Sequence, residues 1–385
     1  MPHNHHAKKG TGSTNHEERI CVAVLGAVPP PWGGQAVMTR LLLDGHYESV
    51  NLKPVNMHFS RTTSDRGNLS FYKIVELFRV ILAVYLARIF GSSILYFAPA
   101  GPERGPLLRD ALVLVSTRWM FRKTIWHFHA GGFHEYQPSN AIERKLFSLA
   151  FDRPTMAIRL AENSPPDDVA VKARMVCVVA NGVPDPTNEY IPPRNSEPAH
   201  LLFIGVLNEG KGVGIIIDAL AILRERGQTV CVDFVGEWAS KAYRLEIEQR
   251  LLENGLTEVV LFHGARTGVE KDRLLRQAAI YCFPSHFRHE NLPVTVIEAM
   301  AYSLPVVATE WRGIPDLVVN DVTGVIVQPH DAMATAEAIS RLLANPEERR
   351  RMGAAARERY VAEFTAETFH RRMSEVFTSV LHADL

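Results

Sequence analysis

"LLFIGVLNEGKGVGIIIDALAILRERGQTVCVDFVG", residues 201–236, contains the unit that decides the fold of this chain. Residues 201–207 form an apolar run of strand length, residues near 213–226 follow a helical pattern, and residues 229–236 form a second apolar run. A strand, a helix and another strand in succession predict parallel strands with helices packed on the sheet.

The same alternation recurs along the chain. Expected strands occupy residues 20–26, 92–99, 123–130, 155–160, 174–180, 258–264, 278–285, 304–309 and 324–329. Expected helices occupy residues 35–44 and 105–121, and the segment from about 332 is helical to near the end, with breaks at Pro346 and Phe364. We therefore predict an α/β protein with two facing, doubly wound, Rossmann-like domains and an interdomain cleft.

A proline-containing stretch, residues 181–200, lacks periodicity and is predicted to link the two domains. A chain of 385 residues is too long for one ordinary core, which also favours two domains. We expect a disordered tail at residues 1–18, an N-terminal domain at 19–188, a C-terminal domain at 189–362, and a helix at 363–385 that crosses back to the N-terminal domain.

The composition excludes some classes of protein. The chain has 42 basic and 42 acidic residues, so no overall charge attracts nucleic acid. Its first residues lack the apolar segment of a secretion signal. The cysteines stand in apolar runs without metal-ligand spacing, which predicts reduced, buried thiols in a cytoplasmic protein. They are Cys21, Cys177, Cys231 and Cys282.

One long apolar segment has two interpretations. Residues 74–90, "IVELFRVILAVYLARIF", include three charged residues and are therefore a poor membrane span. We expect a mostly buried helix there, and the alternative is a helix that lies on a membrane surface.

Unusual loops follow several of the expected strands, at the sheet edge where parallel sheets bind ligands. Gly33 and Gly34 follow the first strand and either form a tight turn or present amides to an anion. Lys211 stands between two glycines just before a helix, where a solvated lysine and a phosphate-binding lysine are the alternatives.

Two histidines alternate along another expected strand. His127 and His129 point to the same face of that strand. A metal site would need a third ligand such as His134 or Glu135, and no carboxylate cluster supports one. We expect histidines that line the core or the cleft, with His129 placed to hydrogen-bond a substrate hydroxyl.

Two acids flank the next strand-to-helix turn, in "RHENLPVTVIEAMA" at residues 288–301. Glu298 stands in an apolar helical run, where a carboxylate is costly unless it is paired or meets a ligand such as a ribose diol. Glu290 precedes Asn291 and Leu292, whose amides are suited to phosphate oxygens. We expect Glu290 to face a hydroxyl-rich or developing cationic group, such as a sugar ring.

Along most of its length the chain resembles the retaining family-4 glycosyltransferases, within glycosyl transferases group 1. The pair of acids eight residues apart, followed by "AMA", is the most specific motif. The other matching stretches are "PPPWGGQA", "HFHAGGF", "VVANGV", "FIGVLNEGKG", the G-x-P at 313–315 and the "TG" at 323–324.

The resemblance implies the GT-B fold and transfer of a sugar, with retention, from a UDP- or GDP-sugar to an acceptor hydroxyl in polysaccharide or glycolipid assembly. It implies no metal and no cofactor. The C-terminal domain would bind the nucleotide-sugar and the N-terminal domain a saccharide or lipid-linked acceptor. Glu290 and His129 are the implied catalytic residues. The implied donor-binding residues are Gly33, Gly34, Lys211, Asn291, Leu292 and Glu298.

The chain departs from the family pattern at Val206, where an arginine often completes a cationic clamp on the pyrophosphate. Arg288, His286 and Arg266 are the candidates to replace that charge. The departure keeps two alternatives open, a nucleotide-sugar epimerase of the same fold and a catalytically silent nucleotide-binding member.

Acceptor binding is the least defined property. The basic cluster of Arg118, Arg122 and Lys123 is either a solvated helix end or a contact with a lipid-linked or phosphorylated acceptor at the inner membrane face. The second interpretation predicts a cytoplasmic protein with peripheral membrane contact.

Overall fold

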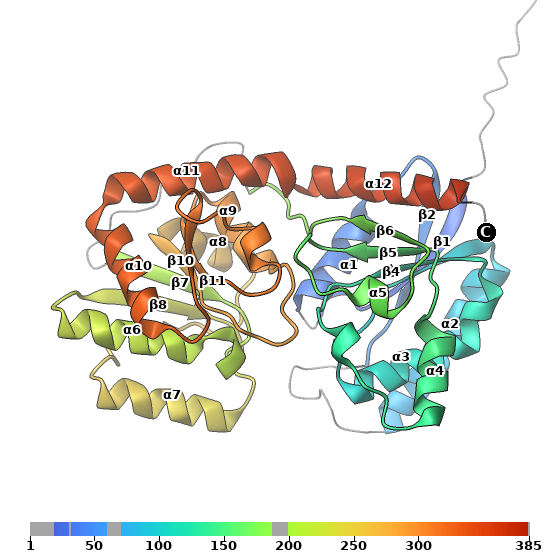
Figure 1. The fold of residues 1–385 in the computed structure, drawn as a ribbon, viewed down its shortest axis with the longest axis horizontal. Helices are drawn as coiled ribbons and strands as arrows, with labels where there is room; N and C mark the ends of the chain where they lie inside the picture. The colour runs from blue at the N-terminus through green and yellow to red at the C-terminus, as the bar shows by residue number, and fades with distance from the viewer. Residues whose placement is uncertain (1–18, 31, 60–70, 187–198, 384–385) are drawn as a thin grey trace, which may run out of the picture.

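The computed structural model describes residues 19–30, 32–59, 71–186 and 199–383. The expected tail at 1–18 and most of the expected linker lie outside the described residues. Two parallel six-stranded sheets form the centre of the molecule, in the orders β2-β1-β3-β4-β5-β6 and β12-β11-β10-β7-β8-β9, each covered by helices (Figure 1). The prediction of two doubly wound sheets is confirmed.

The N-terminal sheet begins with a strand that matches its expected bounds. Its strands are β1 (Ile20–Gly26), β2 (Val50–Asn56), β3 (Ser92–Phe97), β4 (Lys123–His127), β5 (Met156–Arg159) and β6 (Met175–Val178). Its helices are α1 (Gly34–Asp44), α2 (Phe71–Ile89), α3 (Arg104–Thr117), α4 (Ala141–Phe151) and α5 (Asp167–Ala170). Short 3-10 turns lie at η2 (Arg118–Met120) and η3 (Phe133–Glu135).

The C-terminal sheet follows the same plan. Its strands are β7 (Ala199–Ile204), β8 (Val230–Val235), β9 (Val260–Phe262), β10 (Ile280–Phe283), β11 (Val306–Thr309) and β12 (Gly324–Val327). Its helices are α6 (Val213–Glu225), α7 (Lys241–Glu253), α8 (Gly268–Gln277), α9 (Val294–Ala301), α10 (Ala332–Ala344) and α11 (Pro346–Glu363), and α12 (Ala366–His382) ends the chain. Two 3-10 turns complete it, at η4 (Glu209–Lys211) and η5 (Ile314–Asp316).

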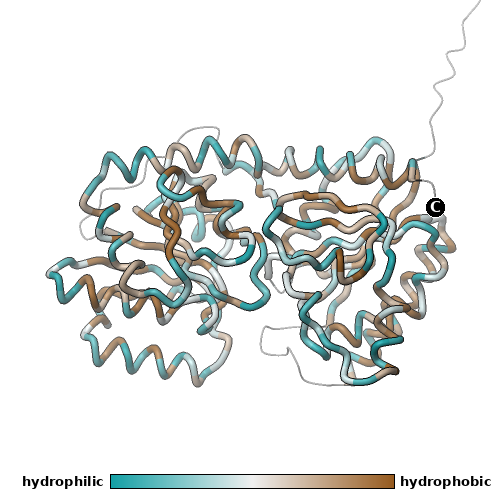
Figure 2. The backbone as a smooth tube through the Cα atoms, in the orientation of Figure 1, coloured by the Kyte–Doolittle hydropathy of each residue, from teal (hydrophilic) through white to brown (hydrophobic). Residues whose placement is uncertain are grey.

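Alternation along the strands builds a core on each face of the N-terminal sheet. On β1, Val22 and Val24 face a core that includes Phe377 of α12. Ala23 and Leu25 face the opposite core, which α2, α3 and α4 cover. Both faces are therefore apolar, which explains why the strands read as continuous hydrophobic runs. Figure 2 shows these runs at the centre of each domain.

Strand β2 is absent from the sequence-based prediction. Its sequence, VNLKPVN, is interrupted by three polar residues and contains Pro54, and a proline is disfavoured in a central strand. In the structure β2 is an edge strand that pairs only with β1, where Pro54 stands opposite Val24. An edge position tolerates a proline, because one side of the strand forms no ladder hydrogen bonds.

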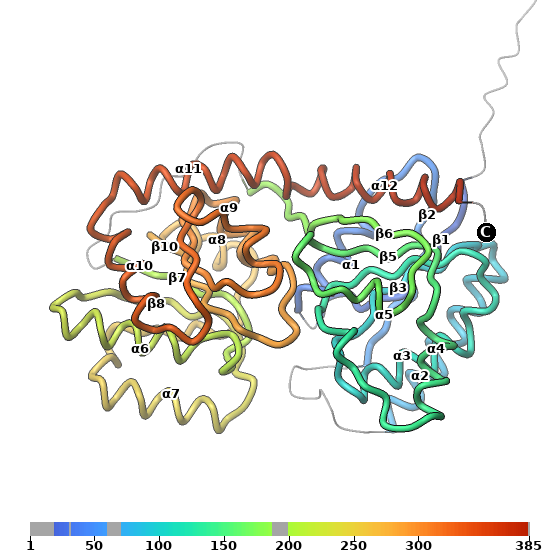
Figure 3. Tube along the Cα trace, viewed as in Figure 1, coloured from blue at the N-terminus to red at the C-terminus, as the bar shows by residue number. Residues whose placement is uncertain are grey.

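Helix α12 packs against the N-terminal domain, far from the sheet that precedes it in sequence (Figure 3). The ring of Phe377 lies 5.1 Å from that of Tyr47, in an edge-to-face arrangement. Lys123 Nζ donates to the Leu381 carbonyl at 2.7 Å. The expected break at Phe364 coincides with the end of α11, and Thr365 caps α12 by accepting from the Thr368 amide.

Helix α2 contradicts the expectation of a mostly buried helix at 74–90. Only one face is buried, through Glu76, Val80 and Val84. The helix lies on the outside of the domain. Leu77, Ile81, Ala83 and Ala87 are partly buried against the core, while apolar residues on the outer side face solvent; Phe78 is 66% exposed. Among the described residues, no helix combines the length and apolar character needed to cross a bilayer.

The basic cluster is only partly exposed. Arg118 donates to the carbonyls of Ala150, Asp152 and Arg153, and Lys123 is bound to α12 as described above. Of the three, Arg122 alone is exposed. Two of these charges therefore hold helix ends in place, which neither interpretation of the cluster anticipated.

The cysteines are less buried than expected. All four are free thiols, but Cys282 alone is fully buried and the other three are partly exposed.

The packing of α12 yields a stability prediction. Phe377→Ala should lower the free energy of unfolding by about 3–5 kcal/mol, because it removes a fully buried ring and leaves a cavity. Val361→Ala, at a half-exposed position of α11, is the control and should change it by less than about 0.5 kcal/mol. Urea unfolding followed by tryptophan fluorescence measures both; equal effects would contradict the packing described here.

Candidate functional site

The expected site residues Lys211 and Glu290 form an ion pair. Lys211 Nζ lies 2.5 Å from Glu290 Oε2, and Ser285 Oγ donates to the same oxygen at 2.8 Å. The ammonium group also lies over the rings of Phe283 and Phe287, 5.4 and 5.1 Å from their centroids. Glu290 is buried, so this pair is largely shielded from solvent.

The glycines beside Lys211 allow the two loops to meet. Gly212 has a φ of 79°, and a Cβ built there would lie 2.2 Å from the Pro284 carbonyl oxygen. A Cβ on Gly210 would lie 3.0 Å from the Phe287 ring. The close approach that these glycines permit is therefore to the loop between β10 and α9, residues 284–293, which contains Glu290.

The same loop is anchored to the N-terminal domain by Asn291. Its Nδ2 donates to the Phe128 carbonyl at 3.0 Å, and its Oδ1 accepts from Ser164 Oγ at 2.6 Å. Asn181 Nδ2 donates to the Leu292 carbonyl at 2.7 Å. Within the described residues, the amides of Asn291 and Leu292 donate to no protein acceptor. The Asn291 side chain and the Leu292 carbonyl thus hold the loop in place, while the amides of Asn291 and Leu292 remain available to a ligand.

The glycine turns of the N-terminal domain face this loop. The Gly131 amide donates to the His289 carbonyl at 3.3 Å, and a Cβ on Gly131 would lie 2.9 Å from the Glu290 carbonyl oxygen. A Cβ on Gly34, the first residue of α1, would lie 3.9 Å from Val294. The structure therefore brings four expected segments together, with Lys211 and residues 290–292 on one side and Gly34 and the turn after His129 on the other.

The two strand-end histidines lie on one face, as expected. Their rings are 4.0 Å apart, and His127 Nδ1 is 2.7 Å from the Tyr96 hydroxyl. Burial lowers the pKa of His129 to about 4, a shift that the nearby Asn181 side chain partly opposes. Burial also lowers the pKa of His127. His129 is therefore neutral near pH 7 and has no protonated imidazolium to offer an anion.

The residues considered as a third metal ligand have other partners. His134 Nδ1 is 2.8 Å from Asp167 Oδ1, and Glu135 pairs with Arg288 and Arg312 at 3.2 and 2.7 Å. No group of three or more His, Cys, Asp or Glu side chains with metal-binding geometry occurs in the described ranges.

Glu298 has a partner that the sequence reasoning missed. Its Oε1 lies 2.6 Å from Lys271 Nζ on α8. In the described part of the chain, no hydrogen bond or ion pair joins Glu298 to the Lys211–Glu290 pair. Lys271 carries no local signal in the sequence, because only the packing of α8 against α9 brings it to this carboxylate.

The candidates to replace the missing arginine at Val206 are engaged elsewhere. Arg288 pairs with Glu135 of the N-terminal domain, and Arg266 pairs with Glu270 at 3.0 Å. Burial and the neighbouring His330 ring lower the pKa of His286, so this side chain supplies no positive charge at neutral pH. Lys211 therefore remains the cation in contact with Glu290.

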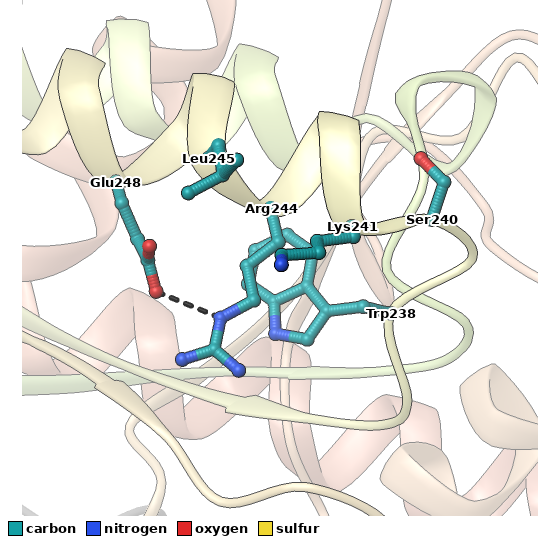
Figure 4. A pocket seen from close by; sticks show the side chains of 6 residues that line it. All are labelled: Trp238, Ser240, Lys241, Arg244, Leu245 and Glu248. Carbon is teal, nitrogen blue, oxygen red and sulfur yellow. Dashed lines mark hydrogen bonds and ion pairs between the residues drawn. The ribbon is translucent and has the colours of Figure 1, made fainter.

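A surface pocket lies away from this cluster. It has a volume of about 480 Å³ and is lined by Trp238, Ser240, Lys241, Arg244, Leu245 and Glu248. Figure 4 shows the hydrogen bond that Arg244 donates to Glu248, one turn further along α7. None of the expected site residues lines it, and we assign it no function.

Solved structures identify the architecture. The chain superposes on sucrose-phosphate synthase from Thermosynechococcus elongatus with a TM-score of 0.71 and 18% identity, over 95% of this chain and 100% of that one. HepE from Anabaena, solved with UDP, gives a TM-score of 0.70 and 16% identity over 94% and 100% of the two chains. The fold is the GT-B architecture, as expected.

Sequence comparison relates the C-terminal half to glycosyltransferases. Residues 186–359 match the model described as Glycosyl transferases group 1. The amylovoran biosynthesis glycosyltransferase AmsK from Erwinia amylovora is 30% identical over 184 residues, which are 47% of this chain and 44% of that protein. The O-antigen chain mannosyltransferase C from Escherichia coli is 29% identical over 183 residues, 47% of each protein. The chain therefore aligns with less than half the length of these relatives.

Gly212 should tolerate substitution less well than a glycine that has a positive φ but no close neighbour. Gly212→Ala should lower the free energy of unfolding by about 1–3 kcal/mol more than Gly227→Ala. Both residues have positive φ, but a Cβ at Gly227 meets nothing within 4 Å. Chemical denaturation of the two variants gives the difference, and equal losses would show that the contact with Pro284 is unimportant.

The lowered pKa of His129 predicts how stability depends on pH. Above pH 6.5 both folded and unfolded states are neutral at this residue. As the pH falls towards 4, the unfolded chain takes up a proton that the folded chain does not, so stability is lost. His129→Gln should therefore reduce this loss by up to about 1.4 kcal/mol per pH unit.

Urea midpoints at pH 7, 5.5 and 4.5 measure the His129 effect. The control is His382→Gln, at an exposed position near the end of α12, which should follow the wild-type curve. An unchanged pH slope in His129→Gln would contradict the burial of this imidazole.

Proposed function

We propose that this chain is a retaining, metal-independent glycosyltransferase that moves a sugar from a nucleoside diphosphate donor to an acceptor hydroxyl. The observation that most directly supports this function is the buried Lys211–Glu290 pair. Glu290 lies in the loop 284–293, which has two available amides at Asn291 and Leu292 and which Lys211 reaches from a second loop; Val294, just after that loop, lies next to Gly34 at the N-terminus of α1. A cation, free amides and a helix N-terminus together suit a diphosphate, and a nearby carboxylate suits sugar hydroxyls.

The donor diphosphate would be held from both domains. The ammonium of Lys211 and the amides of Asn291 and Leu292 would bind it from the C-terminal side. The first amides of α1, which follow Gly33 and Gly34, would face it from the N-terminal side, where the helix dipole favours negative charge. These groups stabilise the charge that develops on the leaving phosphate.

The Lys211–Glu290 pair implies an exchange of partners on binding. In the structure the ammonium group of Lys211 neutralises the buried carboxylate of Glu290. A diphosphate that takes over the ammonium leaves a Glu290 oxygen for the hydroxyls of the sugar ring. Glu298 would make the analogous exchange on α9, from Lys271 to the ribose hydroxyls.

The reaction breaks the bond between the anomeric carbon and the diphosphate oxygen and forms a bond to the acceptor oxygen on the same face. The departing diphosphate takes the acceptor's proton, so no separate protein base is required. Glu290 orients the ring as positive charge builds on it. Neutral His129 binds a sugar hydroxyl across the cleft, a role that its low pKa permits.

The acceptor and the donor base are proposed by analogy with the relatives, and the cellular compartment from the free thiols. AmsK and the O-antigen mannosyltransferase are named for polysaccharide assembly, so we propose a saccharide or lipid-linked acceptor. HepE was solved with UDP, which makes uridine nucleotides the first donors to test, followed by guanosine nucleotides. The four free thiols fit a cytoplasmic enzyme.

The donor site predicts a nucleotide-specific gain in stability. A thermal-shift screen tests UDP, GDP and their sugars. The nucleotide that binds, at a concentration of 100 times its Kd, should raise the free energy of unfolding by about 2.7 kcal/mol. Glu298→Ala should remove most of this shift by deleting the proposed ribose ligand. Glu358→Ala, at an exposed position of α11, is the matched control and should keep it. A shift that survives Glu298→Ala would contradict the assigned role.

The same preparation separates the competing functions. Release of nucleoside diphosphate that depends on added acceptor identifies a transferase. An altered sugar on an intact nucleotide identifies an epimerase, and binding without either product identifies a silent member.

A further inference from the structure

A continuous apolar stripe lies exposed along α2. Its residues recur at helical spacing, so they occupy one side of the helix. Phe71, Phe78 and Ile89 are 79%, 66% and 73% exposed. We define the α2 face as Phe71, Ile74, Val75, Phe78, Leu82, Leu86, Ile89 and Phe90, all of them exposed. Isolated exposed apolar residues are ordinary, but a contiguous stripe of this kind indicates an interaction surface.

An exposed tryptophan extends this face. Trp119 follows α3 and is 73% exposed. Hydrogen bonds tie its turn to α2: the Tyr85 hydroxyl donates to the Ser116 carbonyl at 3.0 Å, and Arg88 Nε donates to the Met120 carbonyl at 3.0 Å. The turn that contains Trp119 therefore lies next to the C-terminal part of α2. Aromatic side chains of this kind favour the boundary between lipid and water.

The charge around the α2 face is positive although the chain as a whole is neutral. Residues 71–122 contain seven Lys and Arg against three Asp and Glu. Two of those three acids, Glu76 and Asp110, are buried and hydrogen-bonded to Arg79 and Arg109. Each of these two pairs is neutral, so the segment keeps an excess of four basic over acidic residues (seven against three), and its basic residues include the exposed Arg88 and Arg122.

We propose that the α2 face docks on an anionic lipid membrane. An apolar helix face flanked by basic and aromatic residues is the composition that binds the boundary of anionic bilayers. A fluid bilayer needs no complementary shape.

The position of α2 connects this surface to the cleft. Tyr72, in the first turn, donates to the His58 carbonyl at 2.9 Å, just beyond the end of β2. The C-terminal ends of β2 and β4 lie at the same edge of the parallel sheet. The turn after His129, which follows β4, contacts the C-terminal domain from that edge. Docking would therefore hold the acceptor side of the cleft at the membrane. If the proposed function holds, the acceptor is a saccharide linked to a lipid in that membrane.

The test is cosedimentation of the full chain with vesicles of phosphatidylcholine alone and of phosphatidylcholine mixed with phosphatidylglycerol. The wild type should bind the anionic vesicles at least about tenfold more tightly, and high salt should weaken this binding. Phe78→Ser with Leu82→Gln should reduce it by at least about tenfold, because both side chains lie on the α2 face. The matched control is Leu245→Gln with Leu252→Gln, an equally exposed pair on α7, which should bind like the wild type.

Each outcome decides the proposal. No binding by the wild type, or equal binding by the α2 and α7 variants, overturns it. Dimerisation by light scattering that the α2 variant abolishes, without vesicle binding, assigns the face to a second copy and also overturns it. Circular dichroism confirms that the variants are folded. No nucleotide-sugar is present, so failure here leaves sugar transfer untouched, and failure of sugar transfer leaves the docking result standing.

Discussion

The site depends on the contact between two loops at Gly212 and Pro284. The backbone of Gly212 is left-handed, and no side chain fits between it and the Pro284 carbonyl. This contact places the ammonium of Lys211 on the carboxylate of Glu290, although the two residues are 79 positions apart. A buried ion pair is favourable only when its geometry is good and its remaining hydrogen bonds are made. Ser285 and the two phenyl rings complete that environment.

The loop that contains Glu290 also joins the two domains. Asn291 hydrogen-bonds to Phe128 and Ser164, and the Gly131 amide donates to the His289 carbonyl. Arg288 and Arg312 bind Glu135 from the other domain. A ligand that takes Lys211 or the loop amides therefore acts on the segment that holds the domains together. Donor binding and the relative position of the domains are expected to be coupled for this reason.

The two domains place their polar chemistry differently. The C-terminal domain contributes charged pairs, Lys211–Glu290 and Lys271–Glu298, which can exchange a protein partner for a ligand. The N-terminal domain contributes backbone amides and the uncharged His129, and its outer helix α2 exposes apolar side chains. The charged pairs proposed to bind the donor thus lie in the C-terminal domain, and the apolar face proposed to meet lipid lies in the N-terminal domain.

Local pattern in the sequence determined most of the strands and helices, because a strand buried on both faces is apolar throughout and a helix repeats every 3.6 residues. It also determined which residues to consider for the site, since Glu290, Glu298 and Lys211 stand in unusual local settings. Tertiary structure alone decided the rest. Pro54 is acceptable because β2 is an edge strand, Lys271 reaches Glu298 because α8 packs on α9, and α2 is exposed because it covers the sheet with one face. Such facts depend on which distant segments meet, and no local periodicity encodes that.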